Sequence, residues 1–140
     1  MKKYILLLLL LPFLSGCSDD DKNNNNPYLP DYNFSMEINM ELPSYAQLMF
    51  PSNPVRIFQA GVGINGIIVM NTGSGFNAFE VSCPNQPLGS CSVLTLNGVN
   101  AVCPCDDMEY SLFTGLGPSQ YSLKPYRVRV ISPTLIEVYN

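Results

Sequence analysis

The feature that most constrains this sequence is a group of four cysteines in a chain that contains no histidine. The cysteines fall in a 24-residue stretch that reads Cys83-Pro84-Asn85, then Cys91, then Cys103-Pro104-Cys105-Asp106. Clustered cysteines either bind a metal or pair as disulfides, and both uses hold two loops together. The lack of histidine excludes a histidine-based catalytic triad and every imidazole metal site. The stretch therefore predicts a small cross-linked domain rather than a histidine-dependent enzyme.

The N-terminus has the pattern of a bacterial export signal. Lys2 and Lys3 provide a positive start, residues 4–14 are apolar, and Leu14-Ser15-Gly16-Cys17 follows. The apolar run is shorter than the about 20 residues that a membrane-spanning helix needs. Its end resembles a bacterial lipobox, so we expect residues 1–16 to be a lipoprotein signal peptide and Cys17 to carry a covalent lipid. The lipid, a palmitate-type acyl modification, would anchor the protein to a membrane without spanning it.

Cleavage before Cys17 would leave five basic and eleven acidic residues, with no basic stripe. This charge balance predicts no nucleic-acid partner. The expected partners are the membrane, through the lipid, and a protein that the sequence does not identify. We expect the bacterial outer membrane, on either its periplasmic or its cell-surface face. Asp19-Asp20-Asp21 resembles a surface-export signal of some Gram-negative lipoproteins, and it fits a simple spacer almost equally well.

The remaining chain divides into a polar segment and a β-rich domain. Residues 17–33 are expected to form a disordered acidic and asparagine-rich tether, because they contain almost nothing to bury. Strict alternation from Phe34 to Leu42 predicts a half-buried strand with both of these side chains facing inward. Turn signals separate further short apolar runs, and this pattern predicts an all-β sandwich or barrel over residues 34–140. The further strands are expected at residues 55–60, 67–70, 76–82, 93–96, 99–102, 110–113, 121–130 and 135–139.

One glycine-rich segment imitates a nucleotide-binding motif. Gly61-Val62-Gly63-Ile64-Asn65-Gly66 fits the pattern G-x-G-x-x-G. A dinucleotide site needs a helix directly after this motif, whereas a β-branched run follows here. We therefore interpret the segment as a turn, with Asn65-Gly66 forming a hairpin.

Residues 76–130 resemble the Rieske iron–sulfur domain. Cys103-Pro104-Cys105 matches the second cluster loop of that family, and Cys83-Pro84-Asn85 stands where its first loop has Cys-x-His. Downstream, Thr114-Gly115, Gly117-Pro118 and a valine-rich strand ending at Val130 follow the family's order. The resemblance implies a Rieske-like antiparallel β-sandwich or barrel with two cysteine-bearing loops.

The resemblance breaks at the cluster ligands. In the family two cysteines hold one iron and two histidines hold the other. The four corresponding positions are Cys83, Asn85, Cys103 and Asp106, so an amide and a carboxylate replace the two imidazoles. We therefore expect no [2Fe-2S] cluster or other cofactor beyond the lipid on Cys17. The alternatives are a divergent cluster or another metal held by Cys83, Cys103 and Asp106, and a hard cation held by Asn85, Asp106, Asp107 and Glu109.

Four cysteines in an oxidising compartment are expected to form two disulfides. A bond between Cys103 and Cys105 would span one residue, and alternate side chains on an extended segment point apart, so two pairings remain. The Rieske resemblance implies Cys83–Cys103 with Cys91–Cys105. The crossed arrangement, Cys83–Cys105 with Cys91–Cys103, is the second possibility.

The sequence as a whole favours a non-enzymatic envelope lipoprotein. Its Rieske-like domain would have lost the cluster, would be stapled by disulfides and would have a structural or binding role. The alternative is a redox protein, either a divergent [2Fe-2S] or metal-binding electron carrier or a thiol–disulfide component.

Overall fold

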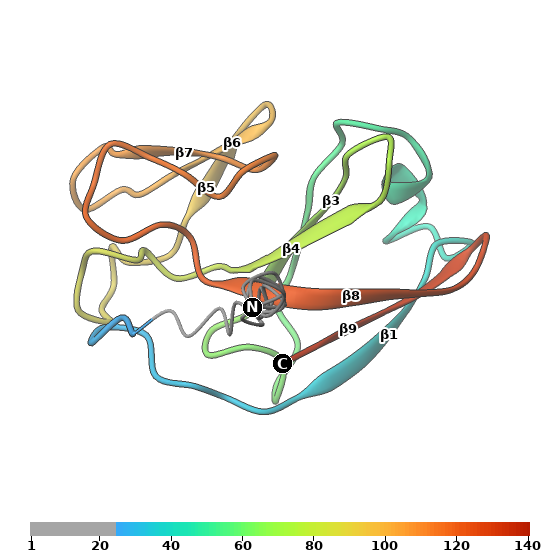
Figure 1. Cartoon of the computed structure of the whole chain (residues 1–140), viewed down its shortest axis with the longest axis horizontal. Helices are drawn as coiled ribbons and strands as arrows, with labels where there is room; N and C mark the ends of the chain where they lie inside the picture. Colours follow the sequence, from blue (N-terminus) through green and yellow to red (C-terminus); the bar gives the residue numbers. More distant parts are fainter. Residues whose placement is uncertain (1–24) are drawn as a thin grey trace, which may run out of the picture.

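The structure is a computed structural model that describes residues 25–140. In this part of the chain a six-stranded antiparallel sheet has the order β1-β9-β8-β4-β3-β2, and a second sheet has the order β5-β6-β7 (Figure 1). The larger sheet curls, and the smaller sheet lies at one end of the molecule (Figure 1). The elements are β1 Ser35–Asn39, 3₁₀ helix η1 Ala46–Met49, β2 Val55–Ile57, β3 Ile67–Asn71, β4 Phe76–Glu80, β5 Thr95–Asn97, β6 Asn100–Val102, β7 Glu109–Ser111, β8 Pro125–Ser132 and β9 Leu135–Tyr139. The all-β prediction is confirmed.

Strand β1 is shorter than the alternation predicted. Met36 and Ile38 point into the core as expected, while β1 pairs with β9 in antiparallel register. The strand ends at Asn39, whose side-chain oxygen accepts a hydrogen bond from the Glu41 amide at 2.9 Å. This local turn competes with the ladder, so the prediction of an inward-facing Leu42 was wrong and that side chain is 50% exposed.

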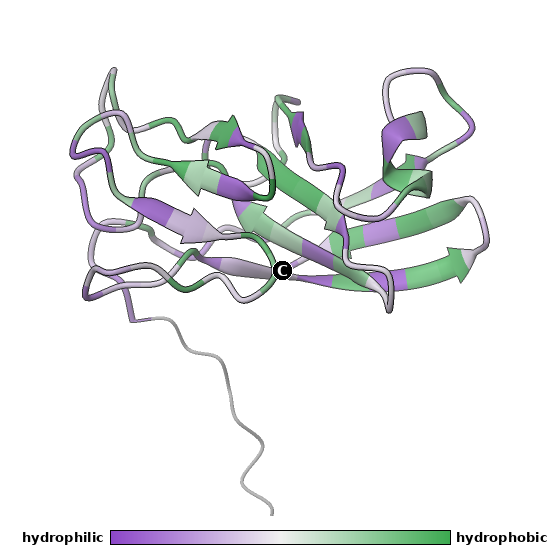
Figure 2. Cartoon of the chain, turned by 90° about the horizontal axis from the view of Figure 1, so that it is seen from above, coloured by the Kyte–Doolittle hydropathy of each residue, from purple (hydrophilic) through white to green (hydrophobic). Residues whose placement is uncertain are grey.

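Strand β3 separates two hydrophobic clusters. Ile67 and Val69 pack in the cluster beneath β1 and β9, whereas Ile68 and Met70 pack in the cluster beneath the small sheet. All four side chains are at most 1% exposed. A strand that is buried on both faces reads as a continuous apolar run, which explains the sequence of β3. Figure 2 shows that the hydrophobic residues concentrate on these central strands, while the connecting loops are largely polar.

The glycine-rich segment forms a loop around a carboxylate of the same chain. No helix follows it, but the predicted two-residue hairpin at Asn65-Gly66 was wrong, because the connection from β2 to β3 spans residues 58–66. The amides of Ile64 and Asn65 donate to the Glu80 carboxylate at 2.7 and 3.1 Å. Gly63 has φ +63°, and a Cβ there would lie 2.6 Å from the Gly66 carbonyl oxygen and 2.8 Å from a Glu80 oxygen. The left-handed backbone and these two close approaches require glycine at this position.

Part of the predicted tether packs on the domain. Residues 26–31, here called the strap, contact Lys124 directly before β8, and the strap residue Leu29 is only 1% exposed. The expectation of a disordered tether as far as residue 33 was therefore wrong for the strap. The reason is long-range: Asn26 and Leu29 find partners that lie far away in the sequence. Residues 17–24 of the predicted tether and the signal peptide, residues 1–16, lie outside the described residues.

Candidate functional site

The two cysteine loops lie at the end of the molecule that carries the small sheet. The first loop leaves the β4 segment at Cys83, and the β5–β6 hairpin delivers Cys103 to the second loop. Disulfides join Cys83 to Cys103, with Cα atoms 5.6 Å apart, and Cys91 to Cys105, with Cα atoms 5.1 Å apart. Both separations are ordinary for disulfides. This is the pairing that the Rieske resemblance implies.

The two bridges differ in their exposure. Cys83 and Cys103 are fully buried in the hydrophobic cluster beneath the small sheet. Cys91 is exposed and Cys105 is half-buried at the rim of the same cluster. One bridge is therefore part of the core, and the other closes the loops on the surface.

Backbone hydrogen bonds hold both loops in shape. In the first loop the Cys83 amide donates to the Ser92 carbonyl at 2.7 Å. In the second, the Cys103 amide donates to the Met108 carbonyl at 2.9 Å, and the Asp107 amide donates to the Cys103 carbonyl at 2.8 Å. Asp107 has φ +58°, a left-handed conformation that aspartate tolerates better than most residues. These contacts make the second loop a tight turn.

Asn85, at the first histidine position of the Rieske pattern, is used in structural hydrogen bonds. Its side-chain amide nitrogen donates to the Tyr121 carbonyl at 2.8 Å and to the Tyr110 hydroxyl at 3.0 Å. Its side-chain oxygen accepts from the Tyr121 amide at 3.0 Å. Both ends of the Asn85 amide are thus occupied by the segment that leads to β8. Asn85 ties the first cysteine loop to that segment and leaves neither polar atom without a partner.

Asp106, at the second histidine position, joins the two loops. One carboxylate oxygen accepts from the Gln86 side-chain amide of the first loop at 2.8 Å. The other accepts from the Met108 backbone amide at 3.1 Å, which is a typical aspartate turn. The sequence did not predict a role for Gln86. Only the position of Gln86 in the first cysteine loop could have indicated it.

The arrangement does not fit a Rieske cluster. Among the described residues, the one group of His, Cys, Asp or Glu ligand atoms close enough to share a metal consists of the sulfurs of Cys83, Cys103 and Cys105, all within 4.8 Å of one another. Asp106 is not in this group, so the predicted alternative of Cys83, Cys103 and Asp106 is not assembled. The carboxylates of Asp106, Asp107 and Glu109 do not form such a group within residues 25–140 either.

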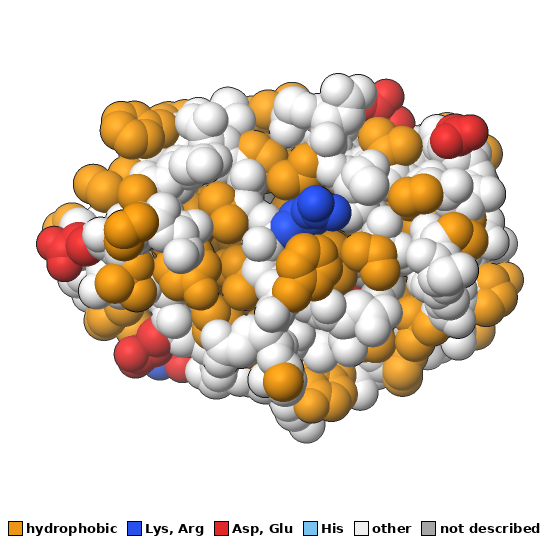
Figure 3. All heavy atoms as spheres, turned by 180° about the vertical axis from the view of Figure 1, so that it is seen from behind, with side chains coloured by type: hydrophobic (Ala, Val, Ile, Leu, Met, Phe, Trp, Pro, Cys, Tyr) orange, Lys and Arg blue, Asp and Glu red, His pale blue; other side chains and the backbone are white. Residues whose placement is uncertain are grey.

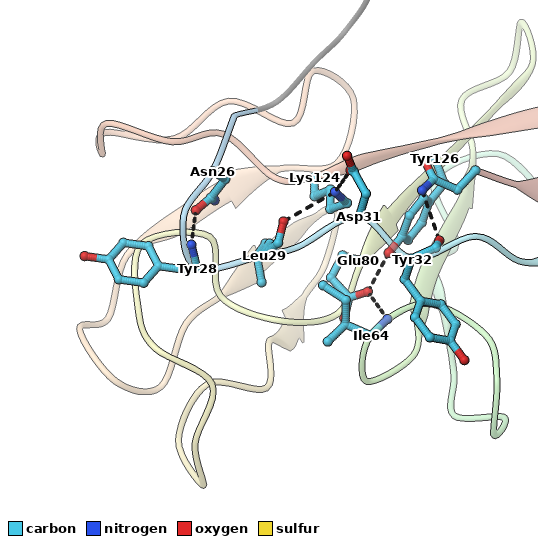
Figure 4. Close-up of polar contacts among 10 residues, drawn as sticks. Asn26, Tyr28, Leu29, Asp31, Tyr32, Ile64, Glu80, Lys124 and Tyr126 are labelled. Atoms are coloured by element: carbon cyan, nitrogen blue, oxygen red, sulfur yellow. Dashed lines mark hydrogen bonds and ion pairs between the residues drawn. The ribbon is translucent and has the colours of Figure 1, made fainter.

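Two charged side chains that the sequence reasoning missed are buried beside the strap. Glu80 is fully buried and accepts five hydrogen bonds, from Ile64, Asn65, Tyr126 and the backbone and hydroxyl of Ser82 (Figure 4 shows two of them). Burial and the neighbouring Glu80 carboxylate raise the pKa of the Tyr126 hydroxyl far above its ordinary value. Lys124 is 3% exposed and pairs with Asp31 at 2.6 Å (Figure 4). A charged residue inside an apolar strand pattern was the signal for Glu80.

A groove lies away from the cysteine loops. It has a volume of about 1150 Å³ and is lined by residues of β4, β8, the chain end and the Phe113–Thr114 loop, with no cysteine among them.

On the face drawn in Figure 3, hydrophobic side chains are scattered among uncharged ones, with acidic groups toward the rim and a basic spot near the centre. Scattered apolar exposure is normal for a protein surface. Surface composition alone therefore does not identify an interface.

Comparison with known proteins supports both the predicted lipoprotein signal and the predicted fold of the β domain. Residues 1–18 match the family model of the prokaryotic membrane lipoprotein lipid attachment site. The chain is thus a membrane-anchored envelope lipoprotein, as the lipobox predicted. Within the described part, no helix has the length and hydropathy of a membrane span.

Solved structures share the fold of the β domain. A chain in the complex of reduced oxygenase and oxidized ferredoxin in carbazole 1,9a-dioxygenase aligns with TM-score 0.50 and 21% identity, over 75% of this chain and 92% of that one. The apo form of a quaternary ammonium Rieske monooxygenase, CntA, aligns with TM-score 0.51 and 13% identity, over 84% of this chain and 35% of that one. No curated protein matches. At these identities the likeness is one of fold, and the Rieske-like fold prediction is confirmed.

Proposed function

We propose that this protein is an outer-membrane lipoprotein, acylated at Cys17, whose Rieske-like domain has exchanged its cluster for two disulfides and serves a structural or binding role. The outer membrane is proposed because the export signal ends in a lipobox and a polar, acidic segment separates it from the domain.

The hydrogen bonding of Asn85 is the observation that carries the proposal. The Asn85 oxygen accepts from the Tyr121 backbone amide, and its nitrogen donates to the Tyr121 carbonyl and the Tyr110 hydroxyl. These three hydrogen bonds orient the side chain toward the segment that leads to β8. Asp106 is likewise used to connect the loops. Both former histidine positions thus support the loops directly.

The disulfides can supply the cross-link that a cluster supplies in the Rieske domain. Their sequence separations are 20 and 14 residues. In the chain-entropy model each bridge stabilises the folded state by roughly 3 kcal/mol. That amount is a large share of the stability of a single domain, which is typically about 5–15 kcal/mol.

A redox role is the second candidate, and one observation favours it. Cys91 is exposed, and its partner Cys105 has its sulfur within 4.8 Å of both Cys83 and Cys103. If the Cys91–Cys105 bridge were reduced, the Cys105 thiolate would lie beside the buried Cys83–Cys103 bridge. Thiol–disulfide exchange requires a thiolate in such a position, because the thiolate attacks a disulfide sulfur.

Intact mass of the protein extracted from bacterial membranes without reductant tests these candidates. We expect no bound iron in native spectra, and alkylation of four cysteines only after reduction in the denatured protein. Stoichiometric iron and sulfide would overturn the cluster-free proposal, and two alkylatable thiols before reduction would favour the redox candidate. A diacylglyceryl group on Cys17 and co-fractionation with outer membranes test the anchor. Protease treatment of intact cells then distinguishes the two faces.

A further inference from the structure

We propose that the end of the domain that carries the two cysteine loops faces the membrane, and that the partner of this end is the bilayer that holds the lipid anchor. This inference rests on the proposed acylation of Cys17. It goes further by assigning which surface of the β domain lies next to the lipid.

The strap fixes the point at which the chain leaves the domain. The Asn26 side-chain nitrogen donates to the Pro84 carbonyl at 2.6 Å, although 58 residues separate them. Pro84 lies directly between Cys83 and Asn85 in the first cysteine loop. Asn26 is 5% exposed, so this contact is part of the packed structure. The chain therefore leaves the domain beside the first cysteine loop and not at the opposite end.

Further contacts hold the rest of the strap in place. Leu29 is buried, and the Lys124 ammonium donates to the Leu29 carbonyl at 3.4 Å and pairs with Asp31 at 2.6 Å (Figure 4). The Tyr28 ring packs edge-on against Tyr121 with 6.3 Å between ring centres. The Asp31 side chain is 77% exposed, so this ion pair is partly solvated, and the buried Leu29 and Asn26 side chains provide the rest of the attachment.

The connection from Cys17 to Asn26 is short. Eight residues lie between them. A chain of nine peptide steps spans at most about 30 Å, whatever its conformation. Asn26, and with it the first cysteine loop, must therefore stay within about 30 Å of the acyl chains. The opposite end, where η1 and the β8–β9 turn lie, is separated from the first cysteine loop by the length of the domain (Figures 1 and 2), so the connection sets no such limit on its distance from the acyl chains.

The chemistry of the cysteine-loop end suits proximity to lipid without independent insertion. Leu88 in the first loop is 46% exposed, and Leu116 in the neighbouring loop is 64% exposed. Asp106, Asp107 and Glu109 lie in or beside the second loop. These carboxylates oppose binding to an anionic bilayer, so the lipid anchor and not the protein surface must provide the attachment.

The absence of tryptophan from the chain allows a direct test. Leu88→Trp places one reporter in the first cysteine loop, and Phe50→Trp places a matched exposed reporter beside η1. Each lipidated full-length protein is reconstituted in vesicles whose headgroups carry a dansyl energy acceptor. We expect the Leu88→Trp protein to lose most of its tryptophan emission and the Phe50→Trp protein to keep most of it. Equal losses, or a larger loss in the Phe50→Trp protein, would overturn the proposed orientation.

Two controls separate this inference from the anchoring on which it rests. Vesicle flotation shows whether the protein is anchored at all, and the Cys17→Ala protein produced without residues 1–16 is expected to remain with the unbound fraction. A protein that does not float contradicts the anchor, whereas one that floats with the wrong reporter quenched contradicts only the orientation. Insertion of about 40 Gly/Ser residues after Asp21, which widens the root-mean-square span to roughly 40 Å, should reduce the emission loss at Leu88→Trp. An unchanged loss would show that the short connection does not set the orientation.

Discussion

Replacement of Glu80 by glutamine is expected to destabilise the domain by about 3 kcal/mol, because this buried carboxylate accepts five hydrogen bonds. Three donors meet one oxygen: the Asn65 amide and both the amide and hydroxyl of Ser82, at 2.8–3.1 Å. The Ile64 amide and the Tyr126 hydroxyl meet the other, each at 2.7 Å. Glu80 thus connects the β2–β3 loop, β4 and β8.

The magnitude follows from what glutamine can and cannot accept. Its single oxygen can replace only one carboxylate oxygen, so its NH₂ group must face at least one backbone N–H of the loop. A hydrogen bond to a charged acceptor contributes about 1.5–3 kcal/mol, and an unsatisfied buried donor costs about 1–3 kcal/mol. The neutral side chain is less costly to bury, which offsets part of the loss. The Tyr126 hydroxyl can rotate and accept a hydrogen bond from the glutamine NH₂ group. The loss of hydrogen bonding therefore falls on the backbone amides of the loop.

Urea unfolding followed by far-UV circular dichroism, with the disulfides intact, measures this change. A loss of about 3 kcal/mol corresponds to a fall in Tm of roughly 10 °C for a domain of this size. Glu41→Gln is the matched control, since Glu41 is exposed, and it should change stability by less than about 0.5 kcal/mol. Amide exchange at Ile64 and Asn65 should accelerate in the Glu80→Gln protein. A Glu80→Gln protein as stable as the Glu41→Gln control would refute the reasoning.

Two further predictions concern pH and redox conditions. The pKa of Tyr126 is raised in the folded protein, so its stabilising contribution is present below the unfolded pKa of about 10 and is lost as pH rises above it. Tyr126→Phe should therefore reduce the alkaline loss of stability, measured as Tm from neutral pH upward; an unchanged pH profile would contradict this. The exposed Cys91–Cys105 bridge should be reduced by dithiothreitol before the buried Cys83–Cys103 bridge, with the order read by alkylation and peptide mapping. Simultaneous reduction under native conditions would show that the domain opens globally.

Much of the fold was accessible from the sequence because it depends on near neighbours. The predicted strand at residues 135–139 coincides with β9, and the hairpin that delivers Cys103 forms from β5 and β6. Hydrophobic alternation correctly placed Met36 and Ile38 in the core. These features follow from the hydrophobic periodicity of each segment and from the residues of the adjacent turns, both of which are local properties of the sequence.

The errors have two physical causes, a local turn and long-range contacts. The β1 boundary depended on whether Asn39 would turn the backbone or continue the ladder, and the alternation pattern does not record that competition. The strap resembled a tether because its composition is polar, yet Pro84 and Lys124 supply hydrogen-bond partners from distant parts of the chain. The composition of a segment indicates how much apolar surface that segment can bury. It does not predict which distant residues the segment will contact.

The sequence by itself determined the chemistry that is available. A chain without histidine cannot complete a Rieske cluster with imidazole ligands, and an N-terminal lipid attachment site directs the chain to a membrane. Tertiary structure decided how the remaining groups are used. It buried one disulfide and exposed the other, enclosed Glu80 among five donors, and placed the exit of the chain beside Pro84. These outcomes depend on which distant segments meet when the sheets close, and that is set by the topology of the whole domain and not by any local pattern.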